Sequence, residues 1–341
     1  LVDGMAGSVN TPPNKDIRWE KTTTVNVGVD FALFRHRLSG TIEYYNKYSV
    51  DLLAAINGSP TQGFGYTTLM TNNGKMVNRG VEITLSGEII RQKDFSWNAS
   101  LLYAFNRNKV KHISVQPSLW DSRISMPTSY PMVGKPLYGI YAYKWAGLNE
   151  NGDPQVYDAE NNVTSGPARD YHALVYCGTT VPIHNASLTN VLRYKGFEFS
   201  AMLILDAGHK LRSSNIPSIN MSNGRITSTA KGIVDRWTQP GDVTDVPRLL
   251  FSNDTENFNT HRTELYRYSD LFVYDASNIR LSNISLAYRV PAHWCKKISL
   301  SGARLQFNVE NVATFAFDSK ANYDLGGKVK PNYVWGLYLN F

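Results

Sequence analysis

The feature of this sequence that most constrains its fold is an alternation of apolar and polar residues over long segments. From residue 25 to residue 33, every second side chain is a large apolar one, with small or polar residues between. The same period recurs at 81–89, 95–105, 197–205 and 333–341. A period of two residues is typical of a β-strand with one apolar and one polar face. No segment shows a sustained helical period, so the sequence predicts an all-β chain.

We predict nine long strands. Their limits are residues 22–34, 37–56, 77–91, 94–106, 183–194, 197–209, 273–290, 298–311 and 331–341. The apolar pattern changes phase between Leu281 and Ile284 and again between Leu300 and Ala303, and each slip indicates a β-bulge. All nine segments have 11 or more residues, whereas strands of soluble proteins usually have about five or six.

Short and long connections alternate along the chain. The short ones are residues 35–36, 92–93, 195–196 and 291–297, and the long ones are 57–76, 107–182, 210–272 and 312–330. This alternation is typical of an outer-membrane barrel with short periplasmic turns and long external loops. The parity places the C-terminus on the periplasmic side and requires an even number of strands within 107–182. We expect a hairpin there, with a strand over 137–147, a turn at Asn149–Asp153 and a short strand near Val156.

Unpaired strand edges are not tolerated in lipid, because each unsatisfied backbone group costs several kcal/mol there. Nine strands would therefore be the C-terminal part of a larger antiparallel barrel. We expect residues 1–341 to form that single portion, with earlier strands supplied by sequence before Leu1.

Composition argues against several functions. The net charge is +7, but Lys and Arg are scattered, and we expect no nucleic-acid partner. Two cysteines, Cys177 and Cys295, are too few for a zinc site or a disulfide framework. The seven histidines are dispersed, and neither a nucleophile-elbow motif nor a phosphate-binding loop is present. The sequence therefore predicts a protein that is not an enzyme, with no catalytic residue, no metal and no cofactor.

Short motifs from about residue 19 to the C-terminus follow the order seen in one family. They are Trp19–Thr23, Asn26–Asp30, Asn73–Glu82, Asn106–Val110, Val133–Leu137, Asn149–Pro154, Asp235–Thr238, Ile279–Asn283 and Asn308–Asn311. Each motif is weak alone, but together they are specific. On these motifs the chain resembles the SusC-like TonB-dependent transporters of Bacteroidetes outer membranes.

The resemblance implies a large, roughly 22-stranded antiparallel transmembrane β-barrel whose lumen holds a plug. It implies import of oligosaccharides (glycans) across the outer membrane together with a SusD-like surface lipoprotein. Energy would come from the TonB complex through a plug and a TonB-binding segment outside these residues. Some family members import oligopeptides, and that remains an alternative. A soluble β-sandwich that binds glycans is the alternative from another class, although strand length and loop alternation argue against it.

Sugar recognition needs aromatic faces that stack on sugar rings and polar groups that bind hydroxyls. Residues of both kinds lie in the expected external loops. The candidates are Trp120, Asp121, Tyr130, Tyr157, Asp158, Tyr171 and Trp237. For each of them, packing within the loops or against the lipoprotein is the alternative role.

The last strand ends with a pattern of its own. Its alternating apolar residues are Tyr333, Trp335, Leu337, Leu339 and Phe341. This pattern resembles the aromatic C-terminal signal by which the barrel-assembly machinery recognises its substrates. Other Tyr and Trp residues near strand ends would form the interfacial girdles of a barrel, in contact with outer-membrane lipid.

Overall fold

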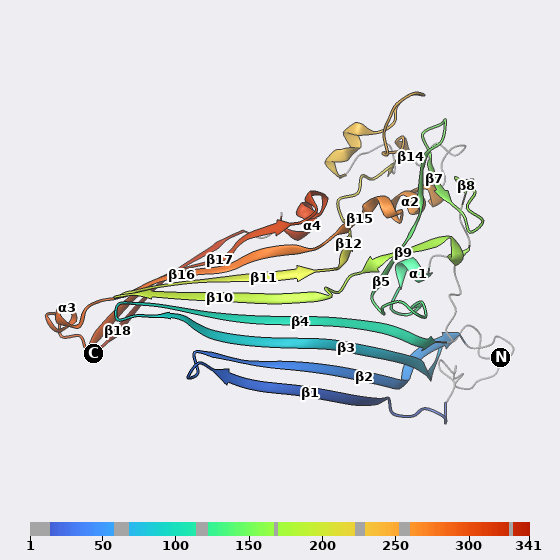
Figure 1. Cartoon of the computed structure of the whole chain (residues 1–341). Coiled ribbons are helices and arrows are strands. Elements are labelled where there is room, and N and C mark those ends of the chain that lie inside the picture. Colours follow the sequence, from blue (N-terminus) through green and yellow to red (C-terminus); the bar gives the residue numbers. More distant parts are fainter. Residues whose placement is uncertain are drawn as a thin grey trace, which may run out of the picture.

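The computed structural model describes residues 14–57, 68–113, 122–166, 170–221, 229–251, 260–326 and 330–341. Nine strands form one antiparallel sheet in the order β1-β2-β3-β4-β10-β11-β16-β17-β18 (Figure 1). Their bounds are Lys21–Leu33 (β1), Leu38–Asn57 (β2), Thr68–Arg91 (β3), Phe95–Ile113 (β4), His184–Tyr194 (β10), Phe197–Ala207 (β11), Asn278–Arg289 (β16), Gly302–Ala316 (β17) and Asn332–Asn340 (β18). Within the described residues, β1 and β18 are the two edges of this sheet.

Each predicted strand overlaps one strand of the sheet, but several ends differ. β3 begins at Thr68 and β4 continues to Ile113, well beyond the predicted limits of 77 and 106. The prediction stopped where the alternation became polar, yet the backbone pairing of the two strands continues. β16 and β17 begin later than predicted, at Asn278 and Gly302.

One of the two predicted β-bulges is confirmed. The pairing of β16 with both of its neighbours shifts register between Leu281 and Asn283, so the extra residue sits where the apolar pattern slips. The bulge predicted after Leu300 is wrong. Leu300 precedes β17, and its buried side chain belongs to the connection that contains α3 (Ala292–Lys296). In the sequence, this buried apolar residue looked like part of the strand, and its spacing from Ala303 therefore suggested a change of phase.

The two faces of the sheet differ in polarity. Residues that pair across antiparallel strands lie on the same face, so the register traces rows. One apolar row consists of Phe31, Leu85, Leu101, Leu188, Leu203 and Leu281, with Gly40 between the first two. Val27, on the same face, is 61% exposed. An exposed apolar surface of this extent requires an apolar partner.

The opposite face carries polar and charged side chains that bind across strands. The Thr41 hydroxyl donates to the Asp30 carboxylate at 2.6 Å. The Glu198 carboxylate accepts hydrogen bonds from Arg193 at 2.7 Å and from Arg304 at 3.1 Å. Two of these contacts join neighbouring strands and the third, from Arg304 of β17 to Glu198 of β11, reaches across β16, so hydrogen bonds and ion pairs link the strands on the polar face.

The short connections lie at one end of the sheet and the long ones at the other (Figure 1). At the long-connection end the chain forms small sheets and helices. The strands are Gly139–Tyr143 (β5), Trp145–Leu148 (β6), Pro154–Tyr157 (β7), Val163–Thr164 (β8), Leu174–Thr179 (β9), Lys210–Arg212 (β12), Asn220–Met221 (β13), Leu250–Phe251 (β14) and Val273–Asp275 (β15), and the helices are Ser122–Ser125 (α1), Thr260–Arg267 (α2) and Asn322–Leu325 (α4). No helix in the described part of the chain is long and apolar enough to cross a bilayer.

The predicted loop hairpin is confirmed as β6 and β7, which pair around the turn at Asn149–Asp153. The single strand expected over 137–147 is wrong, because this run divides into β5, which pairs with β9, and β6. The eight-residue helix α2 was not predicted, because about two helical turns are too short to give a sustained helical period.

The facing of β11 can be tested by substitution in the full-length protein in lipid. Leu203→Arg places a cation in the middle of the apolar face, and we expect the free energy of unfolding to fall by about 2–4 kcal/mol. Ser200→Asn is the control, because Ser200 pairs with Ser285 on the polar face and should tolerate the change. The measurement is urea unfolding in lipid vesicles. Equal midpoints for the two variants would show that the faces are assigned wrongly.

Candidate binding site at the loop end of the sheet

The long loops share a hydrophobic core of their own. All five residues of β5 are buried, including Tyr141 and Tyr143. They pack with Leu265 of α2, while Tyr266 of the same helix joins Ile219 in a second cluster. Burial raises the pKa of Tyr141, whose hydroxyl accepts a hydrogen bond from the Met132 amide at 3.3 Å. The loops are therefore a folded layer that can position side chains.

A charged cluster ties three distant loop segments together. The Asp153 carboxylate accepts two hydrogen bonds from Arg248, at 2.8 and 3.1 Å, and one from Arg262 at 3.1 Å. The Arg262 side chain is only 3% exposed, and it also donates to Asn220 and to the carbonyls of Ile219 and Arg248. Burial lowers the pKa of Arg262 below its ordinary value, and the Asp153 charge offsets only part of this effect. A buried guanidinium with this many acceptors fixes the arrangement of the loops.

The turn at Asn149–Asp153 shows why that sequence is needed. The Asn149 side chain accepts from the amides of Asn151 and Asp153, at 3.0 and 2.9 Å. Gly152 has φ +74°, and a Cβ atom there would collide with the indole ring of Trp237. Trp237, predicted as a sugar-binding residue, therefore lies against this turn, and its amide donates to the Val246 carbonyl at 2.8 Å.

A cavity of about 640 Å³ lies where β2, β3 and β4 meet the segment after α1. Polar groups of its lining include Glu20, His112, Ser129 and Tyr130, and Met76 is one of several apolar members. Met76 shares the face of Gly80 and Glu82, because side chains alternate along β3 without a register shift there. The cavity thus borders the polar face of the sheet, and its size suits a small ligand or one part of a longer one.

The segment beside this cavity is held by the edge of β4 beyond the end of β10. The Gly134 amide donates to the Val110 carbonyl at 2.8 Å, and the Val110 amide donates to the Lys135 carbonyl at 3.0 Å. The Leu137 amide donates to the Asn108 side chain at 2.8 Å. Two of the motifs noted in the sequence, Val133–Leu137 and Asn106–Val110, are therefore hydrogen-bond partners.

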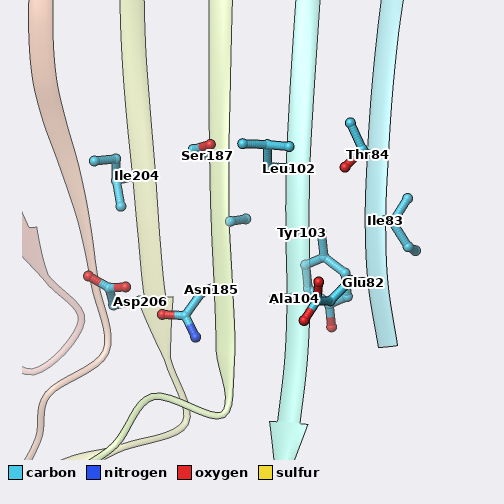
Figure 2. Close-up of a pocket in the computed structure, with 11 residues that line it drawn as sticks. Glu82, Ile83, Thr84, Leu102, Tyr103, Ala104, Asn185, Ser187, Ile204 and Asp206 are labelled. Carbon is cyan, nitrogen blue, oxygen red and sulfur yellow. The ribbon is translucent and has the colours of Figure 1, made fainter. Parts of the chain in front are cut away.

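A second, shallower groove of about 400 Å³ crosses the polar face (Figure 2). Glu82, Ala104, Asn185 and Asp206 are consecutive partners across four strands and lie in it. Figure 2 shows Asp206 and Asn185 close together, with Glu82 on the far side of the groove. The Asp206 carboxylate also accepts from Arg280 at 3.1 Å. This groove presents hydrogen-bonding groups along the sheet.

The described candidates do not form one site. Of these, Tyr130 lines the large cavity. The Tyr157 ring lies under the Lys144 ammonium at 4.7 Å, and Asp158 caps a turn by accepting from the Asn162 amide at 2.7 Å. Trp120 and Asp121 lie outside the described residues, as does the side chain of Tyr171. The hypothesis that these residues contact substrate remains a prediction.

The described residues offer little for catalysis. No cluster of three or more His, Cys, Asp or Glu side chains that could hold a metal ion occurs among them. Burial, followed by the Asp270 charge, raises the pKa of the Cys177 thiol to about 11, so it is protonated and unreactive near neutral pH.

Comparison with known proteins identifies the class. The family model for "TonB dependent receptor-like, beta-barrel" matches residues 2–312. The chain therefore belongs to the TonB-dependent receptor β-barrel family, and its nine-stranded sheet is part of that fold.

Relatives place the chain more closely within that family. TonB-dependent receptor P3 of Formosa agariphila is 25% identical over 95% of this chain and 33% of its own length. TonB-dependent receptor SusC of Bacteroides thetaiotaomicron is 25% identical over 87% of this chain and 29% of its own length. The solved structure of the RagAB peptide transporter superposes with a TM-score of 0.74 and 24% identity, over 100% of this chain and 38% of that chain. The chain thus spans about a third of the length of the curated relatives it matches.

The charged cluster in the loops gives a test of their shared core. Asp153→Asn removes the carboxylate that faces two guanidinium groups, and we expect it to destabilise the loop layer by about 3 kcal/mol. Faster hydrogen–deuterium exchange of the α2 amides is the measurement, with Glu160→Gln, an exposed acid in the same loop, as control. Unchanged exchange in Asp153→Asn would show that the cluster does not hold the loops.

Proposed function

We propose that residues 1–341 are the C-terminal portion of a closed, roughly 22-stranded outer-membrane barrel that imports oligosaccharides. The observation that carries the proposal is one sheet with an exposed apolar face, a polar face and two open edges, β1 and β18. In lipid those edges need further strands as partners. Relatives about three times as long, all of the same receptor family, are consistent with such strands elsewhere in the polypeptide.

The proposed orientation puts the short connections and the C-terminus in the periplasm and the folded loops outside. A SusD-like lipoprotein would cover the loop end, and the TonB complex would act through a plug and a TonB-binding segment outside residues 1–341. The alternating side chains of β18 and its end are exposed on the apolar face, Trp335 at 79% and Phe341 at 92%. We propose that the barrel-assembly machinery reads this pattern during insertion.

The side chains that line the cavity at Tyr130 are the reason for proposing oligosaccharides as the substrate. One aromatic ring, that of Tyr130, is combined there with hydroxyl, imidazole and carboxylate groups, which is the chemistry that binds sugar rings and their hydroxyls. Oligopeptide import is the second candidate, because the RagAB structure with the same fold is that of a peptide transporter. The two substrates are distinguished by direct binding.

The first experiment asks where the intact protein resides. Blotting of fractionated membranes with an antibody to the C-terminal strands should show an outer-membrane protein about three times the length of this chain, as its relatives are. A soluble protein of 38.3 kDa would instead favour the soluble β-sandwich and contradict the proposal.

The substrate is tested by calorimetric titration of the purified full-length protein with a panel of oligosaccharides and a panel of oligopeptides. We expect an oligosaccharide to bind, and Tyr130→Ala to weaken it by about tenfold because a stacking face is lost. Tyr130→Phe keeps the ring and is the matched control, with less than about threefold loss. Binding of peptides alone would establish the second candidate instead. If both variants bound the oligosaccharide as tightly as the wild-type protein does, Tyr130 would not be part of the site.

A further inference from the structure

The end of the sheet with the short connections is unusually basic. The four connections are residues 34–37, 92–94, 195–196 and 290–301. Their charged residues are six basic ones, Arg35, Arg37, Lys93, Lys195, Lys296 and Lys297, and a single acid, Asp94. All six basic side chains belong to exposed residues, and none forms an ion pair within the part of the chain that the structure describes.

Backbone hydrogen bonds join these connections into one rim. The Arg37 carbonyl accepts from the Glu88 amide at 2.8 Å, which links the first connection to β3. The Asp94 carbonyl accepts from the Lys195 amide at 2.9 Å, and the Gly196 carbonyl accepts from the Arg289 amide at 2.8 Å. The cations therefore follow one arc along the end of the sheet instead of being scattered over the surface.

Cations at the loop end behave differently. There, Arg248 and Arg262 bind Asp153, and Lys210 binds Asp275 at 2.9 Å. Hydrogen bonds from Ser277 and Lys210 outweigh the effect of burial and lower the pKa of Asp275 to about 2, so this carboxylate stays ionised. These three loop cations are thus paired with carboxylates, whereas in the rim Arg37 donates to the carbonyls of Glu88 and Ile89, at 3.2 and 3.1 Å, and no carboxylate pairs with a rim cation among the described residues.

An apolar groove of about 360 Å³ lies on the apolar face beside this rim. The Phe197 and Tyr288 rings, 4.5 Å apart, lie in one cross-strand row, and Phe307 and Trp335, 4.2 Å apart, lie in the next. Phe197 follows the Lys195–Gly196 turn directly. The Lys195 ammonium lies 5.3 Å from the centre of the Tyr194 ring, and Tyr194 pairs with Phe197 on the apolar face. This cation is therefore on the side that the proposed function exposes to lipid.

The connection that follows β16 also combines exposed apolar side chains with cations. Trp294 and Ile298 are 55% and 68% exposed, and Lys296 and Lys297 lie between them in sequence. Exposed apolar side chains alternating with free cations suit the boundary between acyl chains and phosphate groups.

We propose that this rim binds an anionic glycerophospholipid of the adjoining leaflet. Its phosphate would lie at Lys195, Lys296 and Lys297, and one acyl chain would occupy the groove between the Phe197 and Trp335 rows. The inference rests on the proposed membrane location but not on the proposed substrate. A cation near an anionic membrane surface contributes roughly fivefold to binding, so the rim would favour anionic over zwitterionic lipid.

The test is native mass spectrometry of the full-length protein purified from membranes and titrated with phosphatidylglycerol or with phosphatidylethanolamine of the same acyl chains. We expect at least about fivefold preference for phosphatidylglycerol. The double variant Lys195→Gln, Lys297→Gln should weaken this preference at least about fivefold and leave binding of phosphatidylethanolamine unchanged. Lys231→Gln is the matched control, since Lys231 is an exposed cation at the loop end.

A wild-type protein that binds both lipids equally, or a double variant that keeps its preference, would overturn the inference. So would a stronger preference for lipopolysaccharide, because that lipid belongs to the opposite leaflet. Each variant is also titrated with the substrate found above, whose affinity should not change. A protein absent from the outer membrane would overturn the proposed function and this inference together, whereas a membrane protein without lipid preference would overturn the inference alone.

Discussion

The structure depends on the pairing of backbone amides and carbonyls across long strands. A chain with one apolar face exposed along its whole length can satisfy those groups in lipid only through such pairing. The register of the nine strands then determines which side chains share a face, because paired residues form rows across the strands. The row through Leu101, Leu188 and Leu203 is apolar, and the adjacent row through Leu102, Ser187 and Ile204 borders the polar groove. The bulge after Leu281 has a related effect, because its extra residue keeps the apolar side chains of β16 on the apolar face on both sides of the bulge.

The loop layer depends on a different interaction, the burial of a guanidinium among carbonyls and one carboxylate. Arg262 reaches Asp153 directly before β7 and Ile219 directly before β13, so it ties the hairpin that begins at Trp145 to the distant α2. Such a group is expensive to bury and is retained only when its partners are complete. The cost is offset by packing of Leu265 and Tyr266 on the same helix. This fixed layer is what can keep the cavity at Tyr130 open beside the sheet.

The sequence allowed the strands to be predicted well and the loops poorly, for physical reasons. Alternation reports which face of a strand is apolar, so it located β1, β11 and β18 and the bulge in β16. The alternation did not predict the parts of strands in which both faces are polar, such as β4 beyond residue 106, because apolar and polar residues do not alternate there. The pairing of Asp153 with Arg248 and Arg262 spans about a hundred residues, and no local pattern announces it. Likewise, nothing in the sequence showed that Gly152 leaves room for the ring of Trp237.

The two ends of the sheet use charge in opposite ways, and this difference links fold to location. At the loop end, three cations, Arg248, Arg262 and Lys210, are paired with carboxylates, and such pairs contribute most in water when they form networks. At the short-connection end, Lys195 lies in a two-residue turn, and its ammonium faces the neighbouring Tyr194 ring. A free positive charge beside an aromatic groove is unfavourable next to bare hydrocarbon and favourable next to phosphate. The position of the rim at the edge of the apolar face therefore matches the level at which a bilayer supplies phosphate.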